Sequence, residues 1–225
     1  MIDFNALFKV TYGLYIVCSG DKNYGNGFIS NTFFQVTAEP AKFASCCSKN
    51  NHTAEIIIKY GVFTVSVLEQ NASAEIIGRF GYKSGKDFNK MEGMNFQYGI
   101  SGAPIIINES IAYLECKVLE KIDMGSHWLF IGELMEAKIL SDTQEALTYS
   151  YYRANRKGVA PKNAPTYIDK SKLEEKKAMT NKENYKCSAC GYIYEESQEQ
   201  IPFADLPDDW KCPLCGADKE DFIQL

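Results

Sequence analysis

Short stretches in which apolar and polar residues alternate fill most of the first 140 positions. In 61–67, Phe, Val and Val alternate with Thr and Ser, and in 114–118 the polar positions are Glu115 and Lys117. Successive side chains of a strand point to opposite faces, so this alternation predicts strands with one apolar and one polar face. Other short apolar runs with Gly or Asn nearby predict further strands at 14–18, 28–30, 33–37, 105–107 and 128–134.

Helical patterns are few and short. We expect helices at 54–60, 73–80 and 144–152, with Thr53 as the N-cap of the first. Many short strands with few helices are typical of a mainly β protein built on a small barrel. The sequence contains no GxGxxG, no P-loop and no HExxH, which argues against a Rossmann cofactor domain.

Charge divides the chain into two parts. Of 225 residues, 24 are Lys or Arg and 29 are Asp or Glu, and this net charge of −5 argues against a general nucleic-acid binder. Residues 183–225 carry 3 basic and 10 acidic residues, whereas the remainder carries 21 and 19. We therefore predict a domain at 1–168, a charged linker at 169–183 and a second domain at 184–225. The alternative for the linker is a surface helix.

Cysteines gather near the C-terminus. The start of the chain does not resemble a signal peptide, and no apolar run approaches a membrane span, so we expect a cytoplasmic protein and few disulfides. Two CxxC loops, each followed by a glycine, can place four thiolates around one ion, and a tetrahedron of sulfur selects zinc or iron. The expected ligands are Cys187, Cys190, Cys212 and Cys215.

The surroundings of these loops favour iron. Six aromatic residues fall within about forty positions of an acidic segment, and an apolar shell limits the access of water to a redox metal. The run YKCSACGYIY … LPDDWKCPLCGADKEDF resembles rubredoxin over about 184–222. Its stretch between the loops is shorter than in many rubredoxins and lacks their Asn-Pro-Gly turn. The resemblance implies one iron on four cysteines that passes single electrons; a structural zinc is the alternative.

Two upstream segments suggest a cofactor site. The segment 45–53 is rich in Ser, Asn and Thr just before the first expected helix, and a helix N-terminus binds phosphate through free N–H groups and partial positive charge. Asn31 and Thr32 interrupt an apolar strand pattern, where amide and hydroxyl groups can reach a flat heteroaromatic ring. Taken alone, the first segment also fits an ordinary capped helix, and the second fits a turn or bulge.

Together these segments resemble the flavin reductase-like FMN-binding split barrels. The shared order is a GxxxN[ST] strand, an Ala-Glu-Pro turn, a strand, the Ser/Asn/Thr loop and a helix. Later motifs include RFG, SGKDF, GSHWLFIGE and APTY. The resemblance spans about 1–168. It implies an FMN-binding split β-barrel with short helices, FMN held noncovalently at or near a dimer interface, and NADH or NADPH as co-substrate.

The resemblance also assigns individual residues. It places Asn31 and Thr32 against the flavin ring and Lys86 at a polar position near the flavin. Ser48, Asn51 and Thr53 match the phosphate loop, and from its charge and place in the segment Lys49 could complete the same pocket. His127 lines the nicotinamide side, or is simply a half-buried histidine, and His52 is expected on the loop surface. A basic stretch could meet nicotinamide phosphates, the acidic domain or solvent: Arg153, Arg156, Lys157 and Lys162.

As a whole, the chain resembles the high-molecular-weight rubredoxins. That resemblance implies that NAD(P)H reduces FMN, that FMN passes single electrons to the iron, and that the iron reduces a partner such as a flavodiiron oxygen or nitric oxide reductase. Opposite net charges of the two domains favour weak, salt-sensitive docking. Two alternatives are a plain NAD(P)H:flavin reductase that supplies reduced FMN and a zinc-containing flavin-binding redox sensor.

Overall fold

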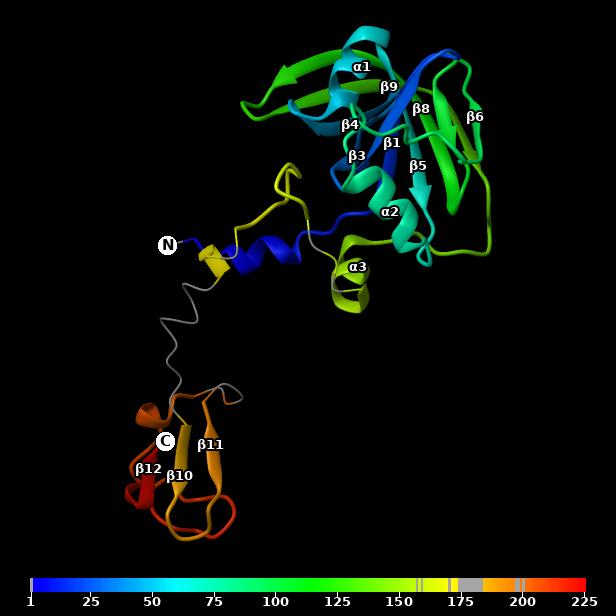
Figure 1. Cartoon of the computed structure of the whole chain (residues 1–225). Coiled ribbons are helices and arrows are strands. Elements are labelled where there is room, and N and C mark those ends of the chain that lie inside the picture. Colours follow the sequence, from blue (N-terminus) through cyan, green and yellow to red (C-terminus); the bar gives the residue numbers. More distant parts are fainter. Residues whose placement is uncertain are drawn as a thin grey trace. The chain divides into compact units, whose positions relative to one another are not determined.

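The chain folds into two compact units, residues Met1–Ile168 and Asp169–Leu225. They were examined in a computed structural model that describes residues 2–156, 158, 160–169, 171–173, 184–196, 199 and 201–225 (Figure 1). Most of the linker predicted at 169–183 lies outside the described residues. Among the helices of the described part, none is long and apolar enough to cross a membrane.

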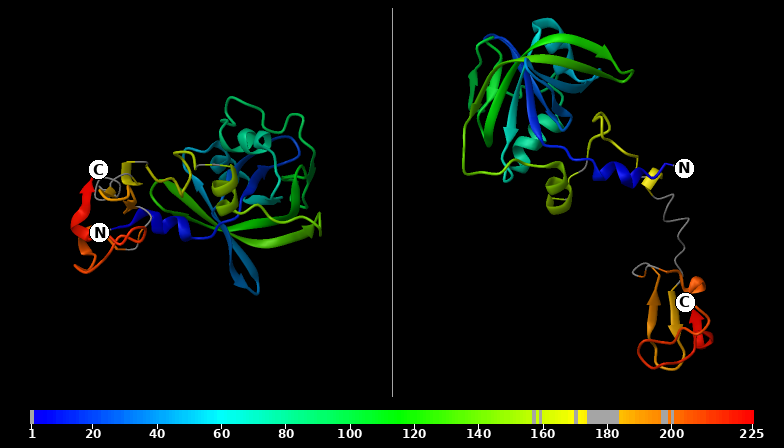
Figure 2. Two further views of the ribbon diagram at one scale, coloured as in Figure 1. Left: turned by 90° about the horizontal axis from the view of Figure 1, so that it is seen from below. Right: turned by 180° about the vertical axis from the view of Figure 1, so that it is seen from behind.

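The first unit is built on an antiparallel seven-stranded sheet. Its strand order is β2-β1-β5-β8-β9-β4-β3. The members are β1 (Tyr15–Gly20), β2 (Gly25–Ser30), β3 (Phe33–Ala38), β4 (Ala41–Ser48), β5 (Val62–Leu68), β8 (Ser110–Asp123) and β9 (His127–Ile139). The end strands β2 and β3 are joined by Asn31 and Thr32 alone, so the sheet has to curl until its two ends meet. Figure 2 shows this curled sheet from two further sides.

Helices and a small hairpin surround the curled sheet. The hairpin pairs β6 (Phe96–Tyr98) with β7 (Pro104–Ile106). The helical elements are η1 (Phe4–Lys9), α1 (His52–Tyr60), α2 (Ala74–Gly81) and α3 (Tyr149–Arg156). Helix α2 packs its apolar face on β1, and helix α1 covers the interior of the barrel, where Ile57 meets Phe63 and Phe130.

The predicted strands all appear, but two predictions about helices are wrong. The N-cap of α1 is Asn51 rather than Thr53: the Asn51 side chain accepts a hydrogen bond from the Thr53 backbone N–H at 3.0 Å. The helix expected at 144–152 starts only at Tyr149. Residues 146 and 148 instead form β-bridges, and the Leu147 backbone bonds to Leu68 and Leu14, because burying Leu147 beside the sheet outweighs a local helical pattern.

Glu115 also departs from the alternation of its strand. It was expected on a polar face, yet its side chain is completely buried. The pairing of β8 with β9 shifts register between Glu115 and Cys116, and the carboxylate accepts hydrogen bonds from the backbone N–H groups of Ile100 at 2.8 Å and Ser101 at 2.9 Å. The Ser101 hydroxyl donates to it as well. The carboxylate thus fixes the turn between β6 and β7.

The second unit is a small three-stranded sheet with order β11-β10-β12. Its elements are β10 (Asn184–Cys187), β11 (Ile193–Glu195), η2 (Phe203–Asp205), η3 (Lys219–Asp221) and β12 (Phe222–Gln224). An aromatic cluster fills its interior, with Phe203 stacked on Tyr185 at a centroid distance of 4.1 Å. The remaining members are Tyr192, Tyr194, Leu206, Trp210 and Phe222. The aromatic residues expected around the CxxC loops therefore form the core of this unit.

Candidate functional site

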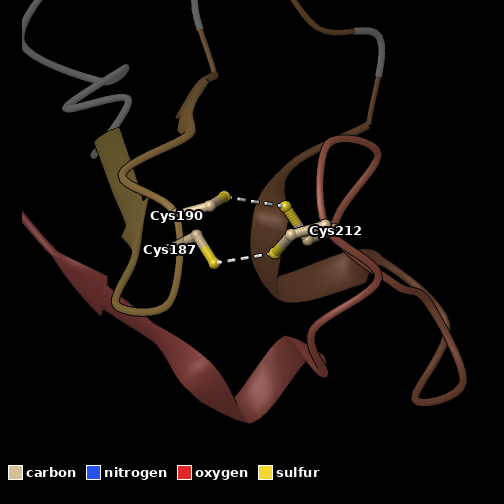
Figure 3. A group of neighbouring side chains, drawn as sticks. Cys187, Cys190 and Cys212 are labelled. Carbon is tan, nitrogen blue, oxygen red and sulfur yellow. Dashed lines mark hydrogen bonds between the residues drawn. The ribbon is translucent and has the colours of Figure 1, made fainter.

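Four cysteine sulfurs converge at one end of the second unit. Figure 3 shows the loop after β10 facing the loop that contains Cys212. The Sγ atoms of Cys187 and Cys215 are 3.8 Å apart, and those of Cys190 and Cys212 are 3.7 Å apart. All four sulfurs lie within 4.8 Å of one another. Cys187 and Cys212 are buried, whereas Cys190 and Cys215 reach the surface.

Both loops make the same turn. The backbone N–H of Gly191 donates to the carbonyl of Cys187 at 2.9 Å, and that of Gly216 donates to Cys212 at 2.8 Å. The two glycines have φ angles of 78° and 75°, in the left-handed region that glycine adopts without strain. Each turn directs its two sulfurs toward the facing loop, so the repeated local geometry creates the fourfold site.

Backbone N–H groups of these turns also favour thiolates. Burial acts to raise the pKa of Cys212, but hydrogen bonds from the backbone of Cys215 and Leu214 outweigh it and lower the pKa to about 7. Backbone hydrogen bonds from Tyr192 to Cys190 and from Ala217 to Cys215 also act to lower the pKa of these thiols, but burial and the neighbouring thiols outweigh them and leave both pKa values raised, that of Cys190 to about 12. A ligand that is easily deprotonated suits a metal, because the thiolate is the form that binds.

The sulfur arrangement fits one tetrahedral ion. A metal–sulfur bond of about 2.3 Å gives a regular tetrahedron with edges of about 3.8 Å. The two sulfur pairs at 3.7 and 3.8 Å match that edge. With all four sulfurs within 4.8 Å of one another, the residues present fit a four-thiolate iron or zinc site.

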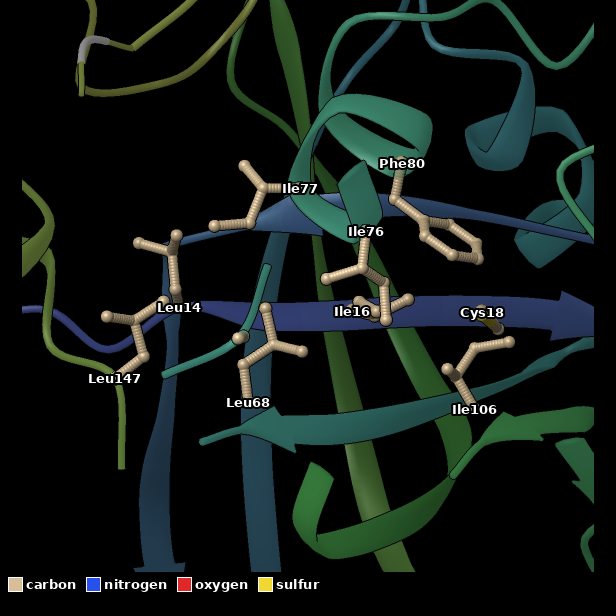
Figure 4. Packing of buried hydrophobic residues seen from close by; sticks show 10 residues of the cluster. Leu14, Ile16, Cys18, Leu68, Ile76, Ile77, Phe80, Ile106 and Leu147 are labelled. Atoms are coloured by element: carbon tan, nitrogen blue, oxygen red, sulfur yellow. The ribbon is translucent and has the colours of Figure 1, made fainter. Parts of the chain in front are cut away.

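A cavity of about 340 Å³ opens on the first unit. Its apolar wall includes Leu14, Ile77 and Phe80, which lie together where α2 packs on β1 (Figure 4). The polar wall includes the end of β4 and the start of α1, and residues 160–165 border the cavity as well. A volume of this order suits a cofactor-sized ligand.

The structure brings three of the predicted flavin residues to this cavity: Asn31, Ser48 and Asn51. The Asn31 side chain is buried and donates to the Thr166 hydroxyl at 2.6 Å. Ser48 ends β4, and its hydroxyl accepts from the Asn50 N–H at 3.3 Å, so the chain turns there into α1. The segment 48–51 thus presents the N-terminus of α1 to the cavity.

Five other predicted residues do not line this cavity. Thr32 lies in the link between β2 and β3, where its N–H donates to Ser30 Oγ at 3.2 Å. Thr53 is fully buried, and its hydroxyl donates to Asn26 Oδ1 at 3.5 Å. The three remaining residues are Lys49, Lys86 and His127.

The two lysines of this group have carboxylate partners. Lys49 Nζ lies 2.5 Å from Asp123 Oδ1 and 4.4 Å from the centroid of the Trp128 ring. Lys86 Nζ lies 3.3 Å from Glu55 Oε1 and lines an adjoining cavity of about 520 Å³. Each ammonium is therefore engaged beside the main cavity rather than within it.

The two histidines lie differently from expectation. His127 does not line the cavity but contacts a residue that does. Its Nε2 is 3.1 Å from the carbonyl oxygen of the lining residue Asn163. His52 was expected on a loop surface but starts α1 and lines the cavity. Its ring is held by the Tyr24 hydroxyl at 2.8 Å and by Glu55 at 3.2 Å.

The basic stretch near α3 is partly structural. The Arg153 guanidinium stacks on the Phe8 ring at 3.4 Å, and Arg156 donates to the carbonyls of Gln70 and Ala72. Lys162 lines the cavity, whereas Lys157 lies outside the described residues.

Sequence reasoning missed several cavity residues. Lys90, Tyr149 and Tyr152 all line it, and burial raises the pKa of both tyrosines. Lys90 belongs to no motif, and the tyrosines come from a segment far along the chain, so no local signal indicates that these residues meet at the cavity.

The described lining of the cavity is positively charged. It contains Lys83, Lys90 and Lys162 but no Asp or Glu. Such a lining favours an anionic ligand.

Known families match both units. The family described as "Flavin reductase like domain" matches residues 7–159, and the family described as "Rubredoxin" matches residues 184–222. An NADH:FAD oxidoreductase of Streptomyces globisporus, SgcE6, has a similar fold, with a TM-score of 0.59 at 24% identity over 65% of this chain and 86% of that one. The class is thus a flavin reductase-like barrel followed by a rubredoxin domain.

Two relatives narrow this class. A high molecular weight rubredoxin of Moorella thermoacetica is 37% identical over the full length of both chains. A ferric-chelate reductase (NAD(P)H) of Archaeoglobus fulgidus is 39% identical over 75% of this chain and 99% of its own length. The chain belongs to the high-molecular-weight rubredoxin family.

Membership in this family defines the type of chemistry. The flavin reductase-like domain implies a flavin and NAD(P)H, and the rubredoxin domain with its four cysteines implies iron. The chain is therefore an oxidoreductase that combines flavin and rubredoxin electron transfer.

Proposed function

We propose that the chain carries electrons from NAD(P)H, through FMN in the cavity of the first unit, to one iron on the four cysteines, and then to an outside redox protein. The observation that carries this proposal is the presence, in one chain, of a cavity free of carboxylates in its described lining and a tetrahedral four-sulfur site. Flavin supplies the conversion between two-electron and one-electron transfer.

The residues present fit FMN in this cavity. The start of α1, with Ser48 and Asn51, supplies N–H and side-chain donors for a phosphate. Leu14, Ile77 and Phe80 supply an apolar wall against which a flat ring can pack, and Asn31 supplies a buried amide. Hydride transfer needs close stacking rather than a nucleophile, so a cavity with no catalytic triad is consistent with the reaction.

The outside acceptor that we propose is a flavodiiron oxygen or nitric oxide reductase, because the high-molecular-weight rubredoxin family points to such a partner.

We also propose a homodimer formed through the barrel. This is supported by large apolar side chains exposed on β3 and β9, the two strands that flank β4, since such patches mark interfaces. They include Phe34, Val36, Met135 and Ile139.

Anaerobic stopped-flow mixing of the holoprotein with NADH tests the relay. We expect the flavin absorption to bleach first and the ferric–thiolate absorption to fade afterwards. Cys190→Ser should leave flavin bleaching unchanged and lower electron delivery to the outside protein at least a hundredfold, because it removes one of four ligands. Ser188→Ala, an exposed change in the same loop, is the matched control. Iron that stays ferric beside reduced flavin would contradict the relay.

A second candidate is a flavin reductase that releases reduced FMN. The observation in its favour is the Archaeoglobus relative, which matches the barrel along 99% of its own length. Deletion of residues 184–225 separates the two functions. Under the relay, the truncated chain reduces flavin but no longer reduces the outside protein. Under the second candidate, reduction of the outside acceptor by released flavin continues at the full rate.

A further inference from the structure

Lys90 is a buried cation on the wall of the cavity. Its side chain is only 4% exposed, and it lines both the main cavity and the adjoining one. The ammonium donates to the carbonyl of Gly27 at 2.9 Å and to the carbonyl of Phe80 at 3.1 Å. An ammonium has three N–H donors, so these two bonds leave one donor for a ligand.

No carboxylate offsets this charge in the described part of the chain. The groups that interact electrostatically with Lys90 are the thiols of Cys18 on β1 and Cys47 on β4. Burial lowers the pKa of Lys90 to about 8, and the two thiols act in the opposite direction. A buried ammonium without a counter-ion is costly, and an anion in the cavity would relieve that cost.

The neighbours of Lys90 connect it to the start of α1. Asn26 Oδ1 accepts from the N–H of Gly27 at 2.7 Å, and the same oxygen accepts from the Thr53 hydroxyl at 3.5 Å. Asn26 thus links Gly27, whose carbonyl accepts from Lys90, to Thr53 in the first turn of α1. Lys90 therefore belongs to the end of the cavity that presents the helix N-terminus, where the phosphate loop was predicted.

We propose that Lys90 supplies the buried positive charge that binds the phosphate of FMN. This inference rests on the proposed function, because it requires FMN in the main cavity. A lysine with a purely structural role would also connect β2 to α2 through its two hydrogen bonds. Such a lysine would not favour FMN over riboflavin. The chemical consequence is selection for a phosphorylated flavin over riboflavin.

Fluorescence titration of the full chain, freed of flavin, with FMN and with riboflavin tests the proposal. For Lys90→Gln we expect FMN affinity to fall about tenfold to hundredfold, the range of a lost bond to a charged group. Riboflavin affinity should change less than threefold. Lys117→Gln removes the same charge from an exposed position of β8 outside the cavity and should alter neither affinity.

A measurement on the unaltered chain keeps the proposal testable if Lys90→Gln fails to fold. With a pKa of about 8 in the ligand-free cavity, Lys90 loses its charge as the pH rises above that value. We therefore expect FMN affinity to fall between pH 7.5 and 9.5. Riboflavin meets the same other titratable groups and should bind equally across this range: Cys18, Asp21, Tyr24, Cys46, Cys47, His52, Tyr82, Lys83, Lys86, Asp87, Tyr98, Tyr149, Tyr152 and Lys162.

The outcomes separate this inference from the proposed function. Equal losses of FMN and riboflavin affinity, in the variant or with pH, would show a structural lysine and overturn the inference while leaving the relay intact. Unchanged FMN affinity would overturn it as well. If the unaltered chain binds neither flavin at any pH, the proposed function itself fails.

Discussion

A single buried polar residue, Glu115, fixes the turn between β6 and β7 in the first unit. Glu115 carries a buried carboxylate whose partners are the backbone N–H groups of Ile100 and Ser101 and the Ser101 hydroxyl. The packing is so close that a Cβ added at Gly99 would clash with Glu115 Oε2. This turn connects β6 and β7, and Tyr98 and Pro104 at its two ends line the cavity beside the main one. The carboxylate therefore positions one wall of that cavity.

Replacing this carboxylate should be costly. We expect Glu115→Ala to lower the free energy of unfolding by about 2–4 kcal/mol, because buried N–H donors lose their acceptor. Glu120→Ala, at an exposed position of the same strand, should change it by less than about 0.5 kcal/mol. Urea unfolding followed by circular dichroism measures both. Similar effects for the two variants would contradict the role assigned to Glu115.

A residue's role could be predicted from the sequence where it depends only on residues nearby in the chain. The four cysteines could be recognised because a CxxC loop determines by itself where two sulfurs point. Lys90 and Glu115 could not, because their partners lie 10 to 63 residues away and depend on how the sheet curls. Glu115 was also misplaced by a register shift in β8, which alternation alone cannot reveal.

Glycines affect the stability of the two helices beside the cavity in different ways. Helix α1 ends at Gly61, which has a φ of 67° and donates its N–H to Ile57 at 2.9 Å. In α2, Gly78 lies inside the helix with open space around it. These two glycines therefore have opposite effects on stability: one permits a left-handed cap, and the other weakens a helix.

Alanine at each position separates these effects. Gly61→Ala should lower the free energy of unfolding by about 1 kcal/mol, because alanine resists a positive φ although nothing crowds its Cβ. Gly78→Ala should raise it by about 0.5–1 kcal/mol through better helix propensity. Thermal unfolding of the two variants, compared with the unaltered chain, provides the measurement. Stabilisation by both substitutions would rule out the cap at Gly61.

Elements were predictable where pattern and tertiary packing agree. Each predicted strand overlaps one of β1, β2, β3, β5, β7, β8 and β9. Most of these strands turn an apolar face to the core, whereas β3 is largely exposed. The segment 144–148 was not, because Leu147 is buried by β-bridging against residues far away in sequence. The α1 cap was assigned two residues late, because Asn51 and Thr53 are both good N-cap residues.

At the scale of the molecule, each unit has its own core. The second unit contains only a handful of buried apolar residues around Phe203 and Tyr194. A unit this small gains much of its stability from a bound metal, whereas the first unit has two apolar clusters. Each of the two compact units thus has an apolar core of its own.

Metal removal should therefore unfold one unit alone. After iron is extracted with acid and a chelator, we expect calorimetry to show loss of the transition of the second unit. The transition of the first unit should move by less than about 2 °C, since metal binding contributes only to the unit that forms the site. Addition of ferrous iron under reducing conditions should restore the lost transition. A large shift of both transitions would contradict independent cores.

The four sulfurs are unequally buried, so the metal centre has one solvent-exposed side, called here the front, and one buried side. Cys187 and Cys212 are buried, whereas Cys190 and Cys215 meet solvent. A competing heavy metal, a mercurial or hypochlorous acid therefore reaches the front pair first. Damage to the centre starts at that edge, and the enclosed pair is the last to let the ion go.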